Sequence, residues 1–171
     1  MKTEVMQIRN SSPYIGGLFF VFIHVDKKGY RRAFMTRREA REQTFILLFE
    51  KSVQNKTTEE VFEDAADARD FELKPFIKKL VEGVDENQEF IDKIISENIK
   101  SWNIKRISKV TLCILRLAIC EILFEKDIPV SVSINEAVEL AKIYGGQGDA
   151  NYINGVLSSV EKKAEYEKDE N

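Results

Sequence analysis

The stretch that decides the fold is VTLCILRLAICEILF, residues 110–124 of the 171-residue chain. Only Thr111, Arg116 and Glu121 interrupt its run of apolar side chains. These three residues are spaced five apart, so they fall on different sides of a helix. A helix that is apolar on nearly all sides is buried, with other elements packed around it. We therefore predict a central, buried helix over residues 110–124.

Helical patterns also lie on both sides of this stretch. Thr36 followed by Glu39 forms a capping box, and the apolar residues behind it predict a helix over residues 36–52. Apolar stripes predict further helices around residues 58–62, 76–84, 91–99, 133–144 and 149–160. A second capping box, Ser133 with Glu136, is expected to open the helix before Gly145, and Asp149 to cap the last helix. No stretch alternates as a strand would, so the predicted fold class is all-α, with about seven helices around the buried one.

The composition limits what the chain can do. Hydrophobic residues make up 43% and charged residues 32%, which is typical of a soluble, folded domain. A single histidine, His24, excludes most multi-histidine metal sites and histidine-based catalytic triads. Cys113 and Cys120 lie on one face of the buried helix, where they fill the core, and they suit a reducing compartment such as the cytoplasm. We therefore expect no metal, no cofactor and no enzymatic activity.

The first 34 residues differ from the rest of the chain. They carry a net charge of +4, which leaves −7 on the remainder. Their apolar segment, residues 14–25, is far shorter than the roughly 20 residues that span a bilayer, and no signal-cleavage site follows it. We favour an upstream-start extension, with Met35 as the natural start, over an edge strand or interaction arm. Residues 35–165 then form the domain, and residues 166–171 a charged, frayed tail.

Three arginines cluster at the start of the first predicted helix: Arg37, Arg38 and Arg41. The helix dipole disfavours positive charge there, so the cluster needs a reason. Backbone N–H groups at a helix start attract phosphate, guanidinium groups add paired hydrogen bonds, and arginine-rich segments hold single-stranded RNA. The alternative is a solvated helix end whose arginines pair with the many acidic residues. The spacing alone favours this alternative and leaves both open.

Two further features carry weaker signals. Arg116, inside the apolar helix, needs an acidic partner, and Glu136 is a candidate. The segment GGQGDAN, residues 145–151, has no Gly-Lys-Ser/Thr ending and no preceding strand, so it does not predict nucleotide binding. It can still form a polar rim beside Lys142.

Four blocks of residues resemble one known family. They are RREARE at residues 37–42, ILRLA at 114–118 followed by Glu121, INEAVELAK at 134–142 and NGVL at 154–157. Through them the chain resembles, from Met35 to about residue 163, the NusB family of bacterial transcription antitermination factors. The resemblance implies two packed helical bundles and a non-enzymatic, RNA-binding role.

The resemblance also implies partners. Family members pair with the ribosomal protein NusE, and the pair binds the single-stranded boxA sequence of nascent ribosomal RNA transcripts. This holds the RNA near RNA polymerase with other Nus factors and suppresses premature termination. No membrane contact is expected. The alternative is a helical protein-interaction module, or a homodimer, without RNA specificity of its own. An enzyme domain is a distant third, because the chain has no glycine-rich cofactor loop or catalytic cysteine motif.

By motif match, the resemblance assigns most of its site residues to RNA. These are Arg37, Arg38, Arg41, Lys142, Gln147 and Asn151. Phe49 stands where the family often has an aromatic residue facing the ribosomal protein. Glu39 and Asn151 stand at positions that are often basic in the family, so the resemblance implies low RNA affinity in the absence of NusE.

Overall fold

The computed structural model describes residues 35–69, 73–99 and 103–169, and every regular element within them is helical. The elements are α1 (Arg37–Gln54), α2 (Thr58–Arg69), α3 (Pro75–Glu86), α4 (Gln88–Asn98), the short 3-10 helix η1 (Ile104–Arg106), α5 (Lys109–Phe124), α6 (Val130–Tyr144) and α7 (Asp149–Asp169). The prediction of an all-α fold with about seven helices is confirmed. The interpretations of residues 1–34 concern a segment outside the described residues.

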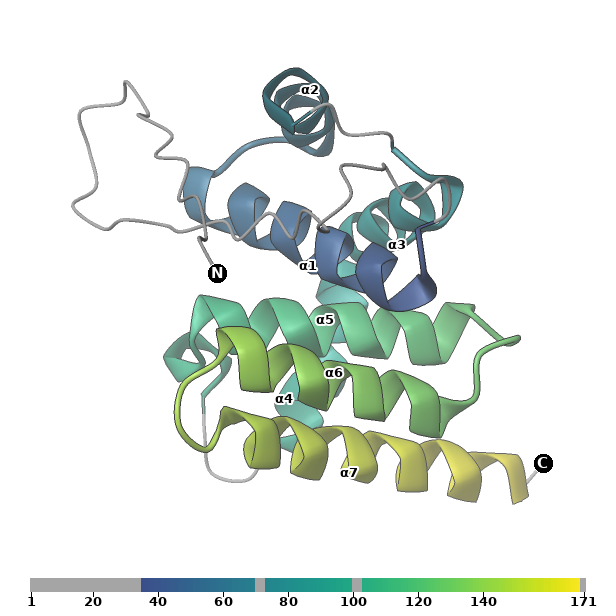
Figure 1. The fold of residues 1–171 in the computed structure, drawn as a ribbon. Coiled ribbons are helices and arrows are strands. Elements are labelled where there is room, and N and C mark those ends of the chain that lie inside the picture. Colours follow the sequence, from purple (N-terminus) through teal and green to yellow (C-terminus); the bar gives the residue numbers. More distant parts are fainter. Residues whose placement is uncertain (1–34, 70–72, 100–102, 170–171) are drawn as a thin grey trace, which may run out of the picture. The chain divides into compact units, whose positions relative to one another are not determined.

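Helix α5 is the centre of this arrangement. It contacts α1, α3, α4, α6 and α7, and nine of its sixteen residues are buried. In Figure 1, α1, α2 and α3 lie on one side of α5, and α6 and α7 lie on the other. The predicted buried helix is confirmed, because its nearly continuous apolar surface supplies a packing face to each of these neighbours.

Local hydrogen bonds explain where the first two helices begin. The Glu39 backbone N–H donates to Thr36 Oγ1 at 3.2 Å, and the Thr36 N–H donates to Glu39 Oε2 at 2.7 Å. This confirms the predicted capping box of α1. Thr57 and Glu60 form the same reciprocal pair before α2. Asn55 ends α1 in the left-handed conformation, with φ of 53°.

The second predicted capping box is wrong. Helix α6 begins at Val130, directly after Pro129, whose fixed φ suits a helix start. Ser133 is therefore inside α6, buried, and its hydroxyl donates to Glu121 on α5. Glu136 lies 3.9 Å from Arg41 of α1, so both side chains of the expected box contact other helices instead.

The turn between α6 and α7 also differs in detail from the prediction. Helix α7 begins at Asp149, but the Asp149 carboxylate accepts the Gly146 N–H at 2.8 Å and so closes the turn before the helix. Gly148 has φ of 94°, a conformation that favours glycine. The backbone of α7 is helical to Asp169, and the frayed tail expected over residues 166–171 stays a prediction.

The predicted partner of Arg116 is wrong as well. Arg116 binds Asp92 of α4 through two parallel hydrogen bonds from one edge of its guanidinium group, Nε to Oδ1 at 2.8 Å and Nη2 to Oδ2 at 2.7 Å. Arg116 therefore joins α5 to α4, a neighbour 24 residues earlier in the chain. None of the helices in the described ranges is long and apolar enough to cross a membrane.

Candidate nucleic-acid interface

The first turn of α1 presents two arginines at the surface. The capping box fixes the backbone there, and Arg37 and Arg38 are both exposed. The guanidinium carbon of Arg37 lies 4.0 Å from the centre of the Phe76 ring, at the start of α3. This is a cation–π contact, which holds the charge in place while its N–H groups still reach solvent. The helix start therefore offers a restrained, accessible cation at the positive end of the helix dipole.

A row of charges runs from α1 to α6 across the surface. Arg38 Nη2 lies 3.3 Å from Glu139 Oε2, and Lys142 Nζ lies 2.6 Å from Glu139 Oε1. Glu139 therefore bridges two of the residues predicted to bind RNA. The side chains of Arg38 and Lys142 remain 57% and 58% exposed, so both can reach a ligand from solvent.

The Glu139 carboxylate carries its charge at neutral pH. The hydrogen bond and charge of Lys142, with a smaller contribution from Arg38, lower the pKa of Glu139 below its ordinary value. The row therefore alternates in sign as Arg38⁺, Glu139⁻ and Lys142⁺.

The third predicted arginine, Arg41, lies in a different environment. Its side chain is 7% exposed, and its Nε donates to Glu121 Oε2 of α5 at 2.7 Å. Its Nη1 lies 3.9 Å from Glu136 Oε2 of α6. Ser133 donates to the other Glu121 oxygen, so Arg41 belongs to a buried polar network joining α1, α5 and α6. Its predicted RNA contact stays a prediction, and its burial favours a structural role.

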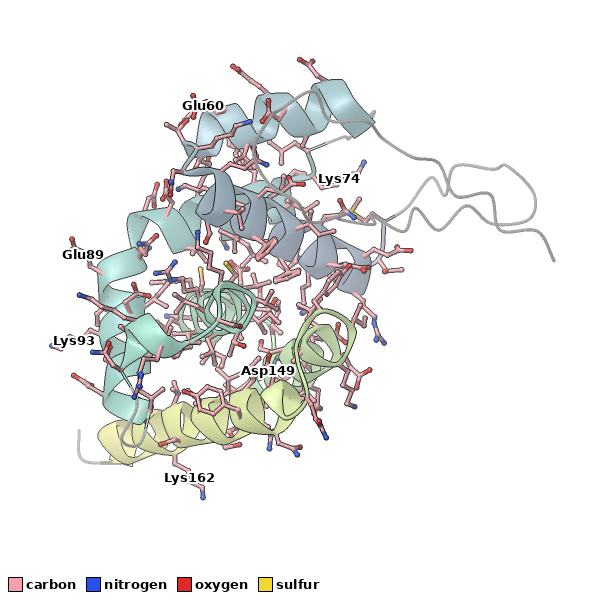
Figure 2. All side chains as sticks on the ribbon, turned by 90° about the vertical axis from the view of Figure 1, so that its left-hand side faces the viewer. Glu60, Lys74, Glu89, Lys93, Asp149 and Lys162 are labelled. Carbon is pink, nitrogen blue, oxygen red and sulfur yellow. The ribbon has the colours of Figure 1, made fainter. Side chains whose placement is uncertain are left out.

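The remaining predicted residues lie apart from this row. Gln147 is exposed in the α6–α7 turn, and Asn151 is exposed in the first turn of α7. Figure 2 shows Asp149, which lies between them, at this turn. In Figure 1 the turn is at the opposite end of the view from the start of α1. Their predicted RNA contacts stay predictions, since no hydrogen bond or ion pair among the described residues joins Gln147 or Asn151 to this row.

Phe49, the predicted partner contact, lies further along α1. It is half-buried and stacks on Phe45, with ring centres 6.0 Å apart. Its predicted contact with a partner stays a prediction.

The sequence interpretation missed two residues of this surface. Phe76 was recognised only as part of the apolar stripe of residues 76–84, although its ring makes the cation–π contact with Arg37. Glu139 was recognised only as part of a motif. Its spacing of three residues from Lys142 could have predicted that pair, but its contact with Arg38 spans 101 positions and depends on the fold.

The family model for the NusB family matches residues 38–162 of the chain. The chain belongs to the NusB family. The match includes Arg38, Glu139 and Lys142. The charge row is therefore part of the region that this chain shares with NusB proteins.

Individual relatives agree with this result. The transcription antitermination protein NusB of Clostridium botulinum (strain Kyoto / Type A2) is 43% identical over 142 residues, covering 74% of this chain and 99% of that protein. A crystal form of T. maritima NusB is similar with a TM-score of 0.67 and 34% identity, covering 75% of this chain and 92% of that one.

A further solved structure contains NusB with partners. A chain in the crystal structure of antitermination factors NusB and NusE in complex with dsRNA is similar with a TM-score of 0.67 and 28% identity. The likeness covers 74% of this chain and 96% of that chain. Within the described part of this protein, no group of three His, Cys, Asp or Glu side chains is arranged to hold a metal ion.

Proposed function

We propose that this protein is a transcription antitermination factor that, together with NusE, binds boxA RNA of nascent ribosomal RNA transcripts. Its role is non-enzymatic: it holds RNA near RNA polymerase with other Nus factors in the cytoplasm and so suppresses premature termination. Membership of the NusB family supports the role, and the NusB–NusE complex with RNA supports the choice of partners.

The observation that carries the RNA proposal is the pair of exposed arginines at the start of α1. Arg37 and Arg38 lie in the first turn of α1, at the positive end of the helix dipole, and Lys142 adds a third cation through Glu139. Guanidinium groups bind phosphate with paired hydrogen bonds, and the helix start favours an anion. The domain as a whole is acidic, so a local cluster of this kind is needed to attract an RNA backbone.

The proposed contacts fall into three groups. Arg37, Arg38 and Lys142 hold phosphates, and Gln147 and Asn151 supply neutral hydrogen-bonding groups at the α6–α7 turn. Phe49 contributes to the surface for NusE. Arg41 positions the site indirectly, because its ion pairs hold the first turn of α1 against α5 and α6.

The experiment is a binding titration of the full-length protein with a labelled boxA RNA and a scrambled RNA of equal composition. Both RNAs are tested with and without NusE, at several salt concentrations. We expect tighter binding to boxA than to the scrambled RNA, a further gain with NusE, and weaker binding at higher salt because each phosphate contact releases counterions. Equal affinity for both RNAs with NusE present would contradict the sequence-specific role.

The same samples test the alternative of an interaction module or homodimer. Light scattering gives the mass of the protein alone and with each RNA. A stable dimer that binds NusE and neither RNA would replace RNA binding with a purely protein-binding role.

A further inference from the structure

Glu139 contacts two of the cations that are proposed to bind phosphate. Its two carboxylate oxygens contact two different cations, Arg38 Nη2 at 3.3 Å and Lys142 Nζ at 2.6 Å. A phosphate that binds Arg38 or Lys142 therefore approaches a cation that already contacts the Glu139 carboxylate.

These internal ion pairs are weak enough to be exchanged. The side chain of Glu139 is 39% exposed, and its two partners are more than half exposed. Exposed pairs of this kind contribute little to stability, because water and salt screen them. An RNA phosphate can therefore replace Glu139 on either cation, but the displaced carboxylate stays close by on the same helix and repels it.

We propose that Glu139 is an internal competitor of RNA, which lowers the affinity of the Arg38–Lys142 surface for phosphate. The inference rests on the proposed function, since it concerns the same surface. The competition acts on the RNA backbone, and phosphate contacts carry no sequence information. Glu139 therefore weakens binding to every RNA by a similar factor. Tight binding then requires the further contacts that boxA bases and NusE add.

The opposite role would be positioning, in which Glu139 holds Arg38 and Lys142 in the geometry that RNA requires. The two roles predict opposite signs for one substitution. If Glu139 competes, its neutralisation tightens RNA binding. If Glu139 positions the cations, the same change weakens RNA binding because both side chains lose their restraint.

The test compares full-length wild type with Glu139→Gln, an isosteric change that removes only the charge. Asp64→Asn is the matched control, because Asp64 is also an exposed acid paired to a lysine, Lys56, but lies on α2. Fluorescence anisotropy gives the Kd for boxA and scrambled RNA from low to physiological salt. We expect Glu139→Gln to bind both RNAs about two- to tenfold more tightly at low salt, with a smaller gain as salt rises. Asp64→Asn should bind nearly as wild type does.

Each outcome decides the inference. Unchanged or weaker binding by Glu139→Gln would overturn it, and so would an equal gain in Asp64→Asn, because the effect would then come from net charge alone. The preference of wild type for boxA over scrambled RNA, with NusE present, judges the proposed function separately. A tighter variant that lacks this preference supports the competitor and contradicts the proposed function. No binding of RNA by either protein would overturn both.

Discussion

Two arginines one turn apart on α1 each bind a glutamate of another helix, yet their surroundings are opposite. Arg38 meets Glu139 at 3.3 Å, with side chains 57% and 39% exposed. Arg41 meets Glu121 at 2.7 Å, with side chains 7% and 2% exposed. Both pairs fasten α1 to its neighbours, but only the exposed pair can exchange its partner for a ligand.

The comparison shows that burial, more than residue type, decides whether an arginine stabilises the fold or is available to bind a ligand. A buried ion has been taken out of water, so it depends on its fixed partners, and losing one of them leaves an unpaired charge. An exposed ion keeps its hydration and exchanges partners at little loss. The arginine motif is therefore divided between two tasks within a single helical turn.

The largest expected effect is on stability, from Arg41→Ala. The substitution leaves the buried Glu121 carboxylate with only the Ser133 hydroxyl, so the free energy of unfolding should fall by about 3–5 kcal/mol. Urea denaturation followed by circular dichroism measures this loss.

Arg38→Ala is the matched control, with an expected loss of no more than about 1 kcal/mol. If Arg41→Ala unfolded at the wild-type urea concentration and lost RNA binding instead, Arg41 would belong to the RNA surface. The contrast between the two arginines would then be wrong.

The second effect is on RNA, from the double variant Arg37→Ala/Arg38→Ala. Removing two phosphate-binding cations should weaken boxA binding about tenfold or more at low salt. It should also flatten the dependence of log K on log salt by about 1.4, since each contact to a single strand contributes about 0.7. Fluorescence anisotropy over a salt series measures both quantities.

The folded state is the control for this variant. Its free energy of unfolding should stay within about 1 kcal/mol of wild type, because both side chains are exposed. A change in affinity with no change in the salt dependence would show that these arginines do not bind phosphate.

The sequence predicted the fold well because the fold depends on local patterns. The apolar residues 110–124 require a buried helix whatever surrounds them, and the Thr36–Glu39 capping box involves only four consecutive residues. The capping box expected at Ser133 is wrong because α6 already begins at Val130, after Pro129, so Ser133 lies inside the helix and its hydroxyl donates to the distant Glu121. Contacts within one helical turn can be predicted from the sequence, whereas contacts between helices can be predicted only once the packing of the helices is known.

The candidate site shows the same limit. The sequence identified the arginine cluster but could not show which arginine is buried and which are exposed. The burial of Arg41 depends on residues 80 and 95 positions later. It also gave Arg116 the wrong partner, since Glu136 and Asp92 are equally plausible acids until α4 is placed beside α5. The roles of single charges were therefore the least predictable part.

A smaller effect comes from a third contact between α1 and α6, which joins a neutral donor to a carboxylate. The Tyr144 hydroxyl donates to Glu42 Oε1 at 2.6 Å, and the Tyr144 ring packs against Phe45 with centres 4.8 Å apart. Tyr144→Phe keeps the ring and removes this hydrogen bond, so unfolding should become easier by about 0.5–1.5 kcal/mol at pH 7. RNA affinity should not change.

The pH dependence of the same variant provides its check. Burial, and then the Glu42 carboxylate, raise the pKa of Tyr144 above its ordinary value. The folded state therefore favours the protonated phenol. This stabilisation is complete below the unfolded pKa of about 10 and is lost as pH rises through the folded pKa. Urea denaturation at pH 7 and pH 11 should show the advantage of wild type over Tyr144→Phe shrinking, and a constant difference would contradict the assigned hydrogen bond.

The smallest effect comes from the contact that restrains the exposed Arg37. The Phe76 ring lies 4.0 Å from the Arg37 guanidinium carbon, and an exposed cation–π contact contributes about 0.5–1 kcal/mol. Phe76→Leu keeps an apolar side chain but removes the aromatic face, so boxA affinity should fall about two- to fivefold as Arg37 loses its restraint. In an Arg37→Ala background the same change should have no further effect on affinity, because the contact is already gone. Anisotropy titrations of the four proteins measure this coupling, and additive losses would mean that Phe76 acts on RNA binding by a route other than Arg37.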